Sequence, residues 1–283
     1  MRDPPEGGRR LPSAGEDMAS ARVERETPQT LSPSYRLAYA DQEFLLRDEL
    51  RPVRLQLELL KPELVLAEHR IGTTVVVFGS ARLPSPEAGA SPRRPGCVLD
   101  AARTYEAART FARLVSRAGQ AHGPERRLVV VTGGGPGVME AANRGAHDVG
   151  AESIGLNIVL PHEQLPNRYI TPELCFRFHY FAIRKLHFML RARALVCFPG
   201  GFGTLDELFE ALNLIQTGKA EPMPILLFDE AYWRRIINFD AMVEEGVISP
   251  QDRDLVRYVE SAEAAWLAIC AHYELDPALA EGS

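Results

Sequence analysis

An acidic and a basic side chain are the residues of this sequence with the clearest catalytic potential. Glu207 follows a glycine-rich turn at 200–204, and Arg184 lies in an earlier segment with helical spacing. A carboxylate beside a bound sugar can stabilise an oxocarbenium-like transition state or activate water. The planar fork of an arginine suits a phosphate or a leaving base. The pair therefore suggests cleavage of an N-glycosidic bond, although Arg184 and Lys185 are equally compatible with a solvated helix face.

The turn before Glu207 has the features of a phosphate-binding loop. An apolar run over 194–198 leads into it, and an amphipathic helix follows it. Glycines let the backbone approach a ligand closely, and the free N–H groups and dipole of a helix N-terminus favour a phosphate. The expected contacts here are Gly200, Gly201, Gly203 and Thr204. The alternative is an ordinary strand-to-helix turn in which Thr204 is only a cap.

Two other loops of small residues follow apolar runs earlier in the chain. Gly79-Ser80 follows Thr73–Phe78, and the loop at 133–137 follows 127–132. In an open α/β sheet, ligands bind at the carboxyl ends of the strands. We therefore expect both loops to meet the turn at 200–204 around one crevice. The contacts expected from the two earlier loops are Gly79, Ser80, Gly134 and Gly135.

The elements that position these residues are predicted from alternating patterns. Continuous apolar runs are typical of parallel strands that are buried on both faces, and helical patterns separate them. We predict an α/β fold, a Rossmann-like parallel sheet with helices on both faces and an N-terminal helical extension. The expected strands are Thr73–Phe78, 127–132, 153–160, 194–198 and 224–228, and the expected helices include 100–118, 178–193, 231–245 and 261–273.

Composition suggests how the 283 residues are organised. The expected parts are a disordered tail over 1–33, a helical extension over 34–70, a Rossmann-like catalytic domain over 71–245 and a C-terminal helical segment over 246–283. Within the extension we expect two or three helices, with Pro52 and Pro62 breaking the pattern. The Pro-rich loop at 83–96 is long enough for a functional lid or a disordered connection, and both interpretations stay open.

Other nucleotide and metal chemistries find less support. There is no GxxxxGK[ST] motif for a P-loop, and neither glycine loop completes the GxGxxG pattern of a dinucleotide dehydrogenase. His179 and His187 share a segment but are eight residues apart, so they do not resemble a zinc pair. We expect neither a metal nor a redox cofactor.

The net charge and the cysteines describe the expected surroundings. A net charge of −6 provides no basic field for nucleic acid, and no apolar run approaches the length of a membrane span. The scattered cysteines suggest neither a disulfide framework nor a zinc site, which suits the cytoplasm. They are Cys97, Cys175, Cys197 and Cys270.

Three segments together resemble the LOG (Lonely Guy) family, over about 71–245. They are GGGPGVMEAANRGA at 133–146, FAIRK at 181–185 and PGGFGTLDE at 199–207. The family comprises nucleoside 5'-monophosphate phosphoribohydrolases, often mislabelled as lysine decarboxylases, and a decarboxylase would need a pyridoxal-phosphate lysine that the sequence does not suggest. The resemblance implies homodimers or larger homo-oligomers.

The resemblance also assigns roles to individual residues. Its catalytic pair corresponds to Arg184 and Glu207, and its substrate-binding segment includes Lys185 and Asp206, with Glu163 in a further contact loop. The helix reads FAIRK where the family has MHxRK, and Asp206 replaces a glutamate. Other segments are closer to the larger bacterial branch, which includes nucleotide nucleosidases.

The expected function is hydrolysis of a nucleoside 5'-monophosphate, AMP-like or a cytokinin riboside monophosphate, to free base and ribose 5-phosphate. A nucleotide-binding or sensing protein without chemistry is the first alternative, and an interaction module is the second. The pair formed by Arg184 and Glu207 favours the enzyme, because sensing does not require that carboxylate.

Overall fold

The computed structural model describes residues 11–21, 25–88, 98–121, 127–161 and 165–280. The chain divides into two compact units, Met1–Leu57 and Glu58–Ser283, and each is described by itself. The described elements of the first unit are α1 (Ala14–Ser20), η1 (Pro33–Tyr35), η2 (Ala38–Ala40), α2 (Gln42–Leu45), η3 (Asp48–Leu50) and the start of α3 (Arg51–Glu68).

Helix α1 lies in the segment 1–33, for which the composition predicts disorder. A capping box stabilises its start: the amide of Glu16 donates to the hydroxyl of Ser13 over 3.2 Å, and the amide of Ser13 donates to the carboxylate of Glu16. All of its side chains are exposed or nearly so. The described part of this segment therefore contains local helical structure without a core.

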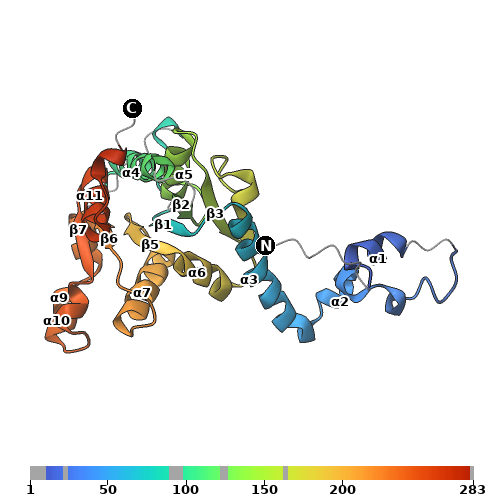
Figure 1. Ribbon diagram of the computed structural model, residues 1–283. Helices are drawn as coiled ribbons and strands as arrows, with labels where there is room; N and C mark the ends of the chain where they lie inside the picture. The colour runs from blue at the N-terminus through green and yellow to red at the C-terminus, as the bar shows by residue number, and fades with distance from the viewer. Residues whose placement is uncertain (1–10, 22–24, 89–97, 122–126, 162–164, 281–283) are drawn as a thin grey trace. The chain divides into compact units, whose positions relative to one another are not determined.

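The second unit contains a parallel sheet of seven described strands in the order β4-β3-β2-β1-β5-β6-β7 (Figure 1). The strands are β1 (Thr73–Phe78), β2 (Leu128–Thr132), β3 (Ser153–Ile158), β4 (Cys175–Phe178), β5 (Ala192–Cys197), β6 (Ile225–Phe228) and β7 (Val256–Val259). The helices after α3 are α4 (Ala101–Ala121), α5 (Val138–His147), α6 (Phe181–Leu190), α7 (Phe202–Gln216), α8 (Glu230–Ile236), α9 (Phe239–Glu244), α10 (Pro250–Arg253) and α11 (Ala262–Tyr273). Short 3₁₀ turns are η4 (Pro86–Ala88), η5 (Pro172–Leu174) and η6 (Pro277–Ala280). The predicted α/β fold is confirmed.

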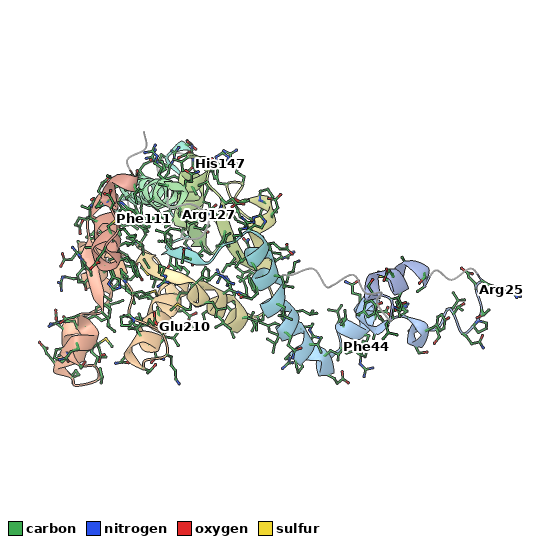
Figure 2. All side chains as sticks on the ribbon, viewed as in Figure 1. Arg25, Phe44, Phe111, Arg127, His147 and Glu210 are labelled. Carbon is green, nitrogen blue, oxygen red and sulfur yellow. The ribbon has the colours of Figure 1, made fainter. Side chains whose placement is uncertain are left out.

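Helices cover both faces of the sheet. In β1, Val75 and Val77 face α4, α5 and α11, while Val76 and Phe78 face the side covered by α6, α7, α8 and α9. The four side chains are at most 3% exposed. Phe111 of α4 is fully buried against the first face (Figure 2). Burying a large apolar side chain contributes about 1.5–3 kcal/mol, so the two faces together stabilise the sheet.

The strand order places a topological switch between β1 and β5. From β1 the chain runs outward through β2, β3 and β4, and then returns to the other side of β1 as β5. The register pairs Phe78 with Cys197, so these two strands end side by side. Crevices for ligands form outside the carboxyl ends of strands at such a switch. The two strands end next to the loops at 79–80 and 199–203.

Several predicted boundaries are wrong. The helix expected over 178–193 is shorter, because Phe178 ends β4 and Ala192 begins β5. The helix expected over 231–245 is split into α8 and α9, because the side chain of Asn238 accepts from the amide of Ala241 and starts a new helix. The expected C-terminal helical segment 246–283 also contributes β7, which pairs with β6.

Pro62 lies inside α3 and does not end it. A proline removes one helical donor, and the acceptor it would have bonded is the carbonyl of residue 58. In this chain the carbonyl of Glu58 lies 3.2 Å from Nε2 of His187, so it has a partner outside the helix. The carbonyl that Pro62 leaves without a helical donor is therefore satisfied outside α3.

Candidate functional site

The three glycine-containing loops meet around the ends of β2, β1 and β5, as predicted. The amide of Ser80 donates to the carbonyl of Pro199 over 3.0 Å, and the amide of Val138 donates to the carbonyl of Ser80 over 3.1 Å. Ser80 therefore connects the loop after β5 to the start of α5. The loops share one edge of the sheet, called the crevice below, where the strand order places a ligand site.

Arg184 crosses this crevice from α6. Its Nε donates to the carbonyl of Leu156 in β3 over 2.7 Å, and its Nη1 donates to Oε1 of Glu207 in α7 over 3.2 Å. Its guanidinium also lies 5.1 Å from the ring centre of Phe188. A Cβ on Gly133 would lie 2.5 Å from Nη2 of Arg184, so a larger residue there would displace the guanidinium from its present position.

Glu207 is largely shielded from solvent, and its pKa is shifted far from the ordinary value. The side chains of Arg184 and Glu207 are only 10% and 11% exposed. Burial raises the pKa of Glu207 to about 7, against the opposing charge of Arg184. Burial also lowers the pKa of Arg184. A carboxyl group with a pKa near neutrality can change its protonation state during a reaction, as a general acid or base must.

The N-terminus of α7 forms one wall of the crevice. Gly201 is its N-cap residue, and no side chain caps the helix among the described residues, so its first amides are open to a ligand. The hydroxyl of Tyr232 donates to the carbonyl of Gly200 over 2.6 Å and holds the turn in place. A Cβ on Gly200 would lie 2.1 Å from Oγ1 of Thr204, which makes glycine necessary there. Thr204 itself is 5% exposed.

The loop after β2 is held by a buried network that includes two asparagines. The side chain of Asn167 donates to the carbonyls of Gly134 and Gly135 over 3.2 and 3.0 Å. It also donates to Oδ1 of Asn143 over 2.9 Å, and the hydroxyl of Thr132 donates to the same atom over 2.7 Å. Because each buried polar group here has partners, the network fixes the glycine loop rigidly.

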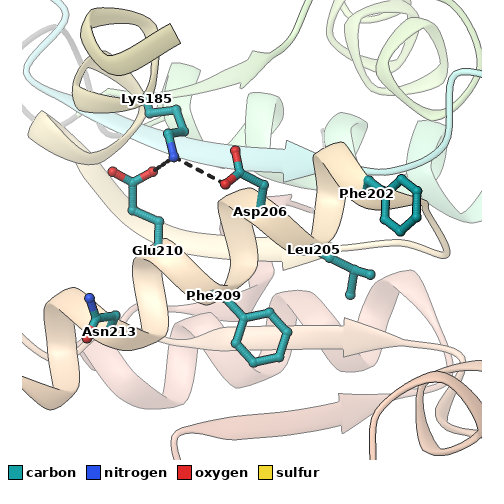
Figure 3. A pocket seen from close by; sticks show the side chains of 7 residues that line it. All are labelled: Lys185, Phe202, Leu205, Asp206, Phe209, Glu210 and Asn213. Atoms are coloured by element: carbon teal, nitrogen blue, oxygen red, sulfur yellow. Dashed lines mark hydrogen bonds and ion pairs between the residues drawn. The ribbon is translucent and has the colours of Figure 1, made fainter.

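Lys185 and Asp206 lie beside the crevice, on the outer side of α6 and α7. Nζ of Lys185 is 3.3 Å from Asp206 and 2.8 Å from Glu210 (Figure 3). These side chains line an open groove together with Phe202, Leu205, Phe209 and Asn213. Neither Arg184 nor Glu207 lines that groove, so the structure separates the two residue sets that the sequence analysis groups together.

Other predicted contacts are distributed as follows. Gly79, Ser80, Gly134, Gly135, Gly200, Gly201, Gly203 and Thr204 lie on the loops around the crevice. Glu163, Cys97 and the loop residues 89–96 are outside the described residues. Tyr232 and Asn167 were not predicted, because neither belongs to a glycine loop and their contacts depend on tertiary packing.

The described residues include no group of three or more His, Cys, Asp or Glu side chains arranged to hold a metal ion. Among the helices the structure describes, none combines the length and apolarity needed to cross a membrane.

Residues 139–269 match the sequence model of a family described as "Possible lysine decarboxylase". Two similar proteins from Arabidopsis thaliana are the cytokinin riboside 5'-monophosphate phosphoribohydrolases LOG7 and LOG3. LOG7 is 34% identical over 137 residues, which are 47% of this chain and 61% of LOG7. LOG3 is 33% identical over 136 residues, which are 46% of this chain and 61% of LOG3. The chain thus spans about three fifths of the length of these relatives, and the predicted resemblance to the LOG family is confirmed.

Solved structures with similar coordinates include a molybdenum cofactor binding protein from Rippkaea orientalis, with 18% identity and a TM-score of 0.45 over 71% of this chain and 96% of that chain. The molybdenum cofactor carrier protein of Chlamydomonas reinhardtii has the same identity and TM-score, over 71% of this chain and 98% of that chain.

Proposed function

We propose that this relative of the LOG proteins hydrolyses the N-glycosidic bond of a nucleoside 5'-monophosphate, AMP-like or a cytokinin riboside monophosphate. The observation that carries the proposal is the buried pair of Arg184 and Glu207 beside the open N-terminus of α7. The names of LOG7 and LOG3 describe the same class of reaction.

In this proposal the 5'-phosphate binds the amides at the start of α7, where the helix dipole favours an anion. The ribose then extends toward Glu207, and Arg184 orients the substrate. The bond between C1' of the ribose and the base nitrogen breaks, with its electron pair leaving on the base. The ionised carboxylate of Glu207 stabilises the positive charge that develops on the sugar and accepts a proton from the attacking water. The water oxygen becomes the 1-hydroxyl of ribose 5-phosphate, and Glu207 passes the proton that it accepted on to the departing base, which regenerates the carboxylate.

A second copy of the chain is the partner we propose. Large apolar side chains are exposed on α6 and α7, and Phe202 is 92% exposed. The others are Phe181, Leu186, Leu190 and Phe209. Exposed apolar clusters of this kind are typical of protein contacts. Sedimentation velocity of the wild type and of Phe202→Asp distinguishes a dimer, which the variant weakens, from a monomer. The cytoplasmic location expected from the cysteines stays a prediction.

The enzymatic test is an end-point assay of the purified chain with AMP, GMP, CMP, UMP and isopentenyl-AMP. Chromatography follows the free base, and a coupled assay follows ribose 5-phosphate. We expect equal amounts of both products from at least one nucleotide. Adenosine is the matched control, because it lacks the phosphate that α7 binds, and we expect it to react far more slowly.

Two results separate the alternatives. Release of base from a nucleotide and from adenosine at equal rates would contradict the role of α7 in binding phosphate. Saturable binding of nucleotides by calorimetry, without any release of base, would favour the nucleotide-sensing protein over the enzyme.

A further inference from the structure

Helix α3 contacts the helix that carries Arg184 through Glu58 and also through Glu63, which lies 3.4 Å from Nδ1 of His187; Glu58 is the residue that holds the start of that helix. The two carboxylate oxygens of Glu58 accept from the amides of His179 and Tyr180 over 2.8 and 3.1 Å. Tyr180 is the N-cap residue of α6, and its own side chain does not cap the helix. Glu58 therefore supplies, from a separate helix, the negative charge that stabilises the start of α6.

The backbone of Glu58 contacts the same helix about two turns further along. Its carbonyl lies 3.2 Å from Nε2 of His187. A carbonyl can only accept, so Nε2 of His187 is the protonated nitrogen in this contact. The carbonyl is available because Pro62, four residues later in α3, has no N–H to donate. The proline thus converts an internal helical acceptor into a contact with α6.

Arg184 lies between these two points of attachment. Its amide donates to the carbonyl of Tyr180, the N-cap residue, over 3.1 Å. Three residues later, His187 is 5% exposed and packs against Phe178 at 5.4 Å between ring centres. A helix held before and after Arg184 directs the guanidinium to Glu207 with little freedom.

We propose that Glu58 is a positioning residue: it fixes α6 so that Arg184 meets Glu207, and Pro62 frees the carbonyl that completes the attachment. The expected effect on kcat rests on the proposed function, whereas the geometric role of Glu58 does not. Glu58 touches neither the crevice loops nor the reacting groups among the described contacts, and it acts through α6.

The geometric test follows the Nε–H of Arg184 by ¹⁵N NMR, because its bond to Leu156 makes its hydrogen exchange slow. Arg184→Lys identifies the resonance. In Glu58→Ala we expect exchange to accelerate by about tenfold or more, since the start of α6 opens locally. Glu58→Gln keeps one acceptor oxygen, and we expect an intermediate rate. Glu68→Ala removes an exposed glutamate of the same helix, and we expect the wild-type rate.

The kinetic test uses the same variants with the nucleotide that reacts fastest. In Glu58→Ala we expect kcat to fall by about tenfold while KM changes by less than about threefold, because misplacing Arg184 does not move the phosphate loop. If Glu58→Ala only reduced the amount of folded protein, the number of active sites would fall in proportion to kcat, and titration with a tight-binding product or inhibitor would reveal this. In that case Glu58→Gln would not restore kcat.

Pro62→Ala provides an independent variant that does not weaken α3. Alanine restores an N–H that competes for the carbonyl of Glu58 and also favours the helix. We expect an equal or higher Tm together with faster exchange of the Nε2–H of His187. A lower Tm without any change at His187 would contradict the role given to Pro62.

The two proposals fail in different ways. If the wild type releases no base from any nucleotide, the proposed function is wrong, and the exchange at Arg184 still decides the role of Glu58. If the wild type is active and Glu58→Ala matches Glu68→Ala in both exchange and kcat, the positioning role is wrong and the function stands.

Discussion

Two arginine–glutamate pairs involve α6 or its end, and they differ in almost every respect. At the crevice, Arg184 and Glu207 make one contact of 3.2 Å with side chains 10% and 11% exposed. At the end of α6, Arg191 makes two contacts with the carboxylate of Glu63, of 2.5 and 2.7 Å, and Glu63 is 33% exposed. The first pair is buried and singly bonded, and the second is partly solvated and bidentate.

The carboxyl groups of the two pairs shift in opposite directions. Burial raises the pKa of Glu207 to about 7, because desolvation outweighs the nearby positive charge. Two hydrogen bonds from Arg191 lower the pKa of Glu63. The same residue types thus produce a group ready for proton transfer at one place and an anchor that is ionised at neutral pH at the other. Geometry and solvent access, rather than residue identity, separate a reactive pair from a structural one.

The largest expected difference lies between the two glutamates. Glu207→Gln keeps the shape of the site but removes its charge, and we expect kcat to fall by about 10³-fold with nucleotide binding retained. Glu63→Gln removes the corresponding charge from the structural pair, and we expect kcat to stay within about threefold of the wild type. Steady-state release of base and calorimetric binding measure both. Normal turnover by Glu207→Gln would remove this carboxylate from the mechanism.

Replacing each arginine with alanine gives the next largest expected difference in kcat/KM. Arg184→Ala leaves Glu207 buried without its counter-charge, and we expect kcat/KM to fall by about 10²-fold. Arg191→Ala breaks the partly solvated pair and should lower kcat/KM by about threefold or less, because α6 keeps its other attachments. The comparison uses the same assay for both variants. Similar losses in both would mean that Arg184 has only a structural role.

The pH dependence of kcat/KM sharpens the same contrast. The ionised form of Glu207 is the active one in the proposed mechanism, so the rate should rise with pH up to about 7 and then level off. Arg184→Gln removes the charge that lowers the pKa of Glu207, so the rising limb of the pH profile should move to higher pH. Lys185, Asp206 and Glu210 also act on Glu207 and are unchanged in the variant.

The substrate phosphate titrates near pH 6, so the informative quantity is the shift between wild type and variant. In Glu63→Gln we expect no shift of the limb. An identical limb in the wild type and in Arg184→Gln would show that Glu207 does not control the profile.

The sequence predicts the central sheet and the crevice because their signals are local. An apolar run such as Thr73–Phe78 marks a buried strand, and a glycine cluster at its end marks a tight turn, without reference to the rest of the chain. The edge strands β4 and β7 were not predicted, because their local signals are weak. They are four residues long, and each carries an exposed arginine, Arg177 and Arg257, so their patterns are short and partly polar.

Tertiary contacts explain the rest of what was missed. Pro62 predicts a helix break when only its neighbours are considered, but α3 continues through it, and the carbonyl that it frees is satisfied by His187, which is far away in the sequence. The opposite pKa directions of Glu63 and Glu207 depend on burial, which packing determines. Sequence can therefore nominate Arg184 and Glu207 as partners but cannot predict that their pair is the buried one.

The smallest expected effect concerns stability in acid. The pKa of Glu63 is lower in the folded protein than in the unfolded chain, so its contribution is present above the unfolded value of 4.5 and is lost as pH falls through the folded value. At pH 7 we expect Glu63→Gln to lower the free energy of unfolding by at most about 1 kcal/mol, because the pair is partly solvated. Urea denaturation at pH 7 and at successive values below 4.5 should show the difference from wild type shrinking as the carboxyl group protonates. Glu68→Gln, an exposed glutamate of the same helix, should follow the wild type throughout. A difference for Glu63→Gln that stays constant at all pH values would mean that packing, rather than charge, accounts for it.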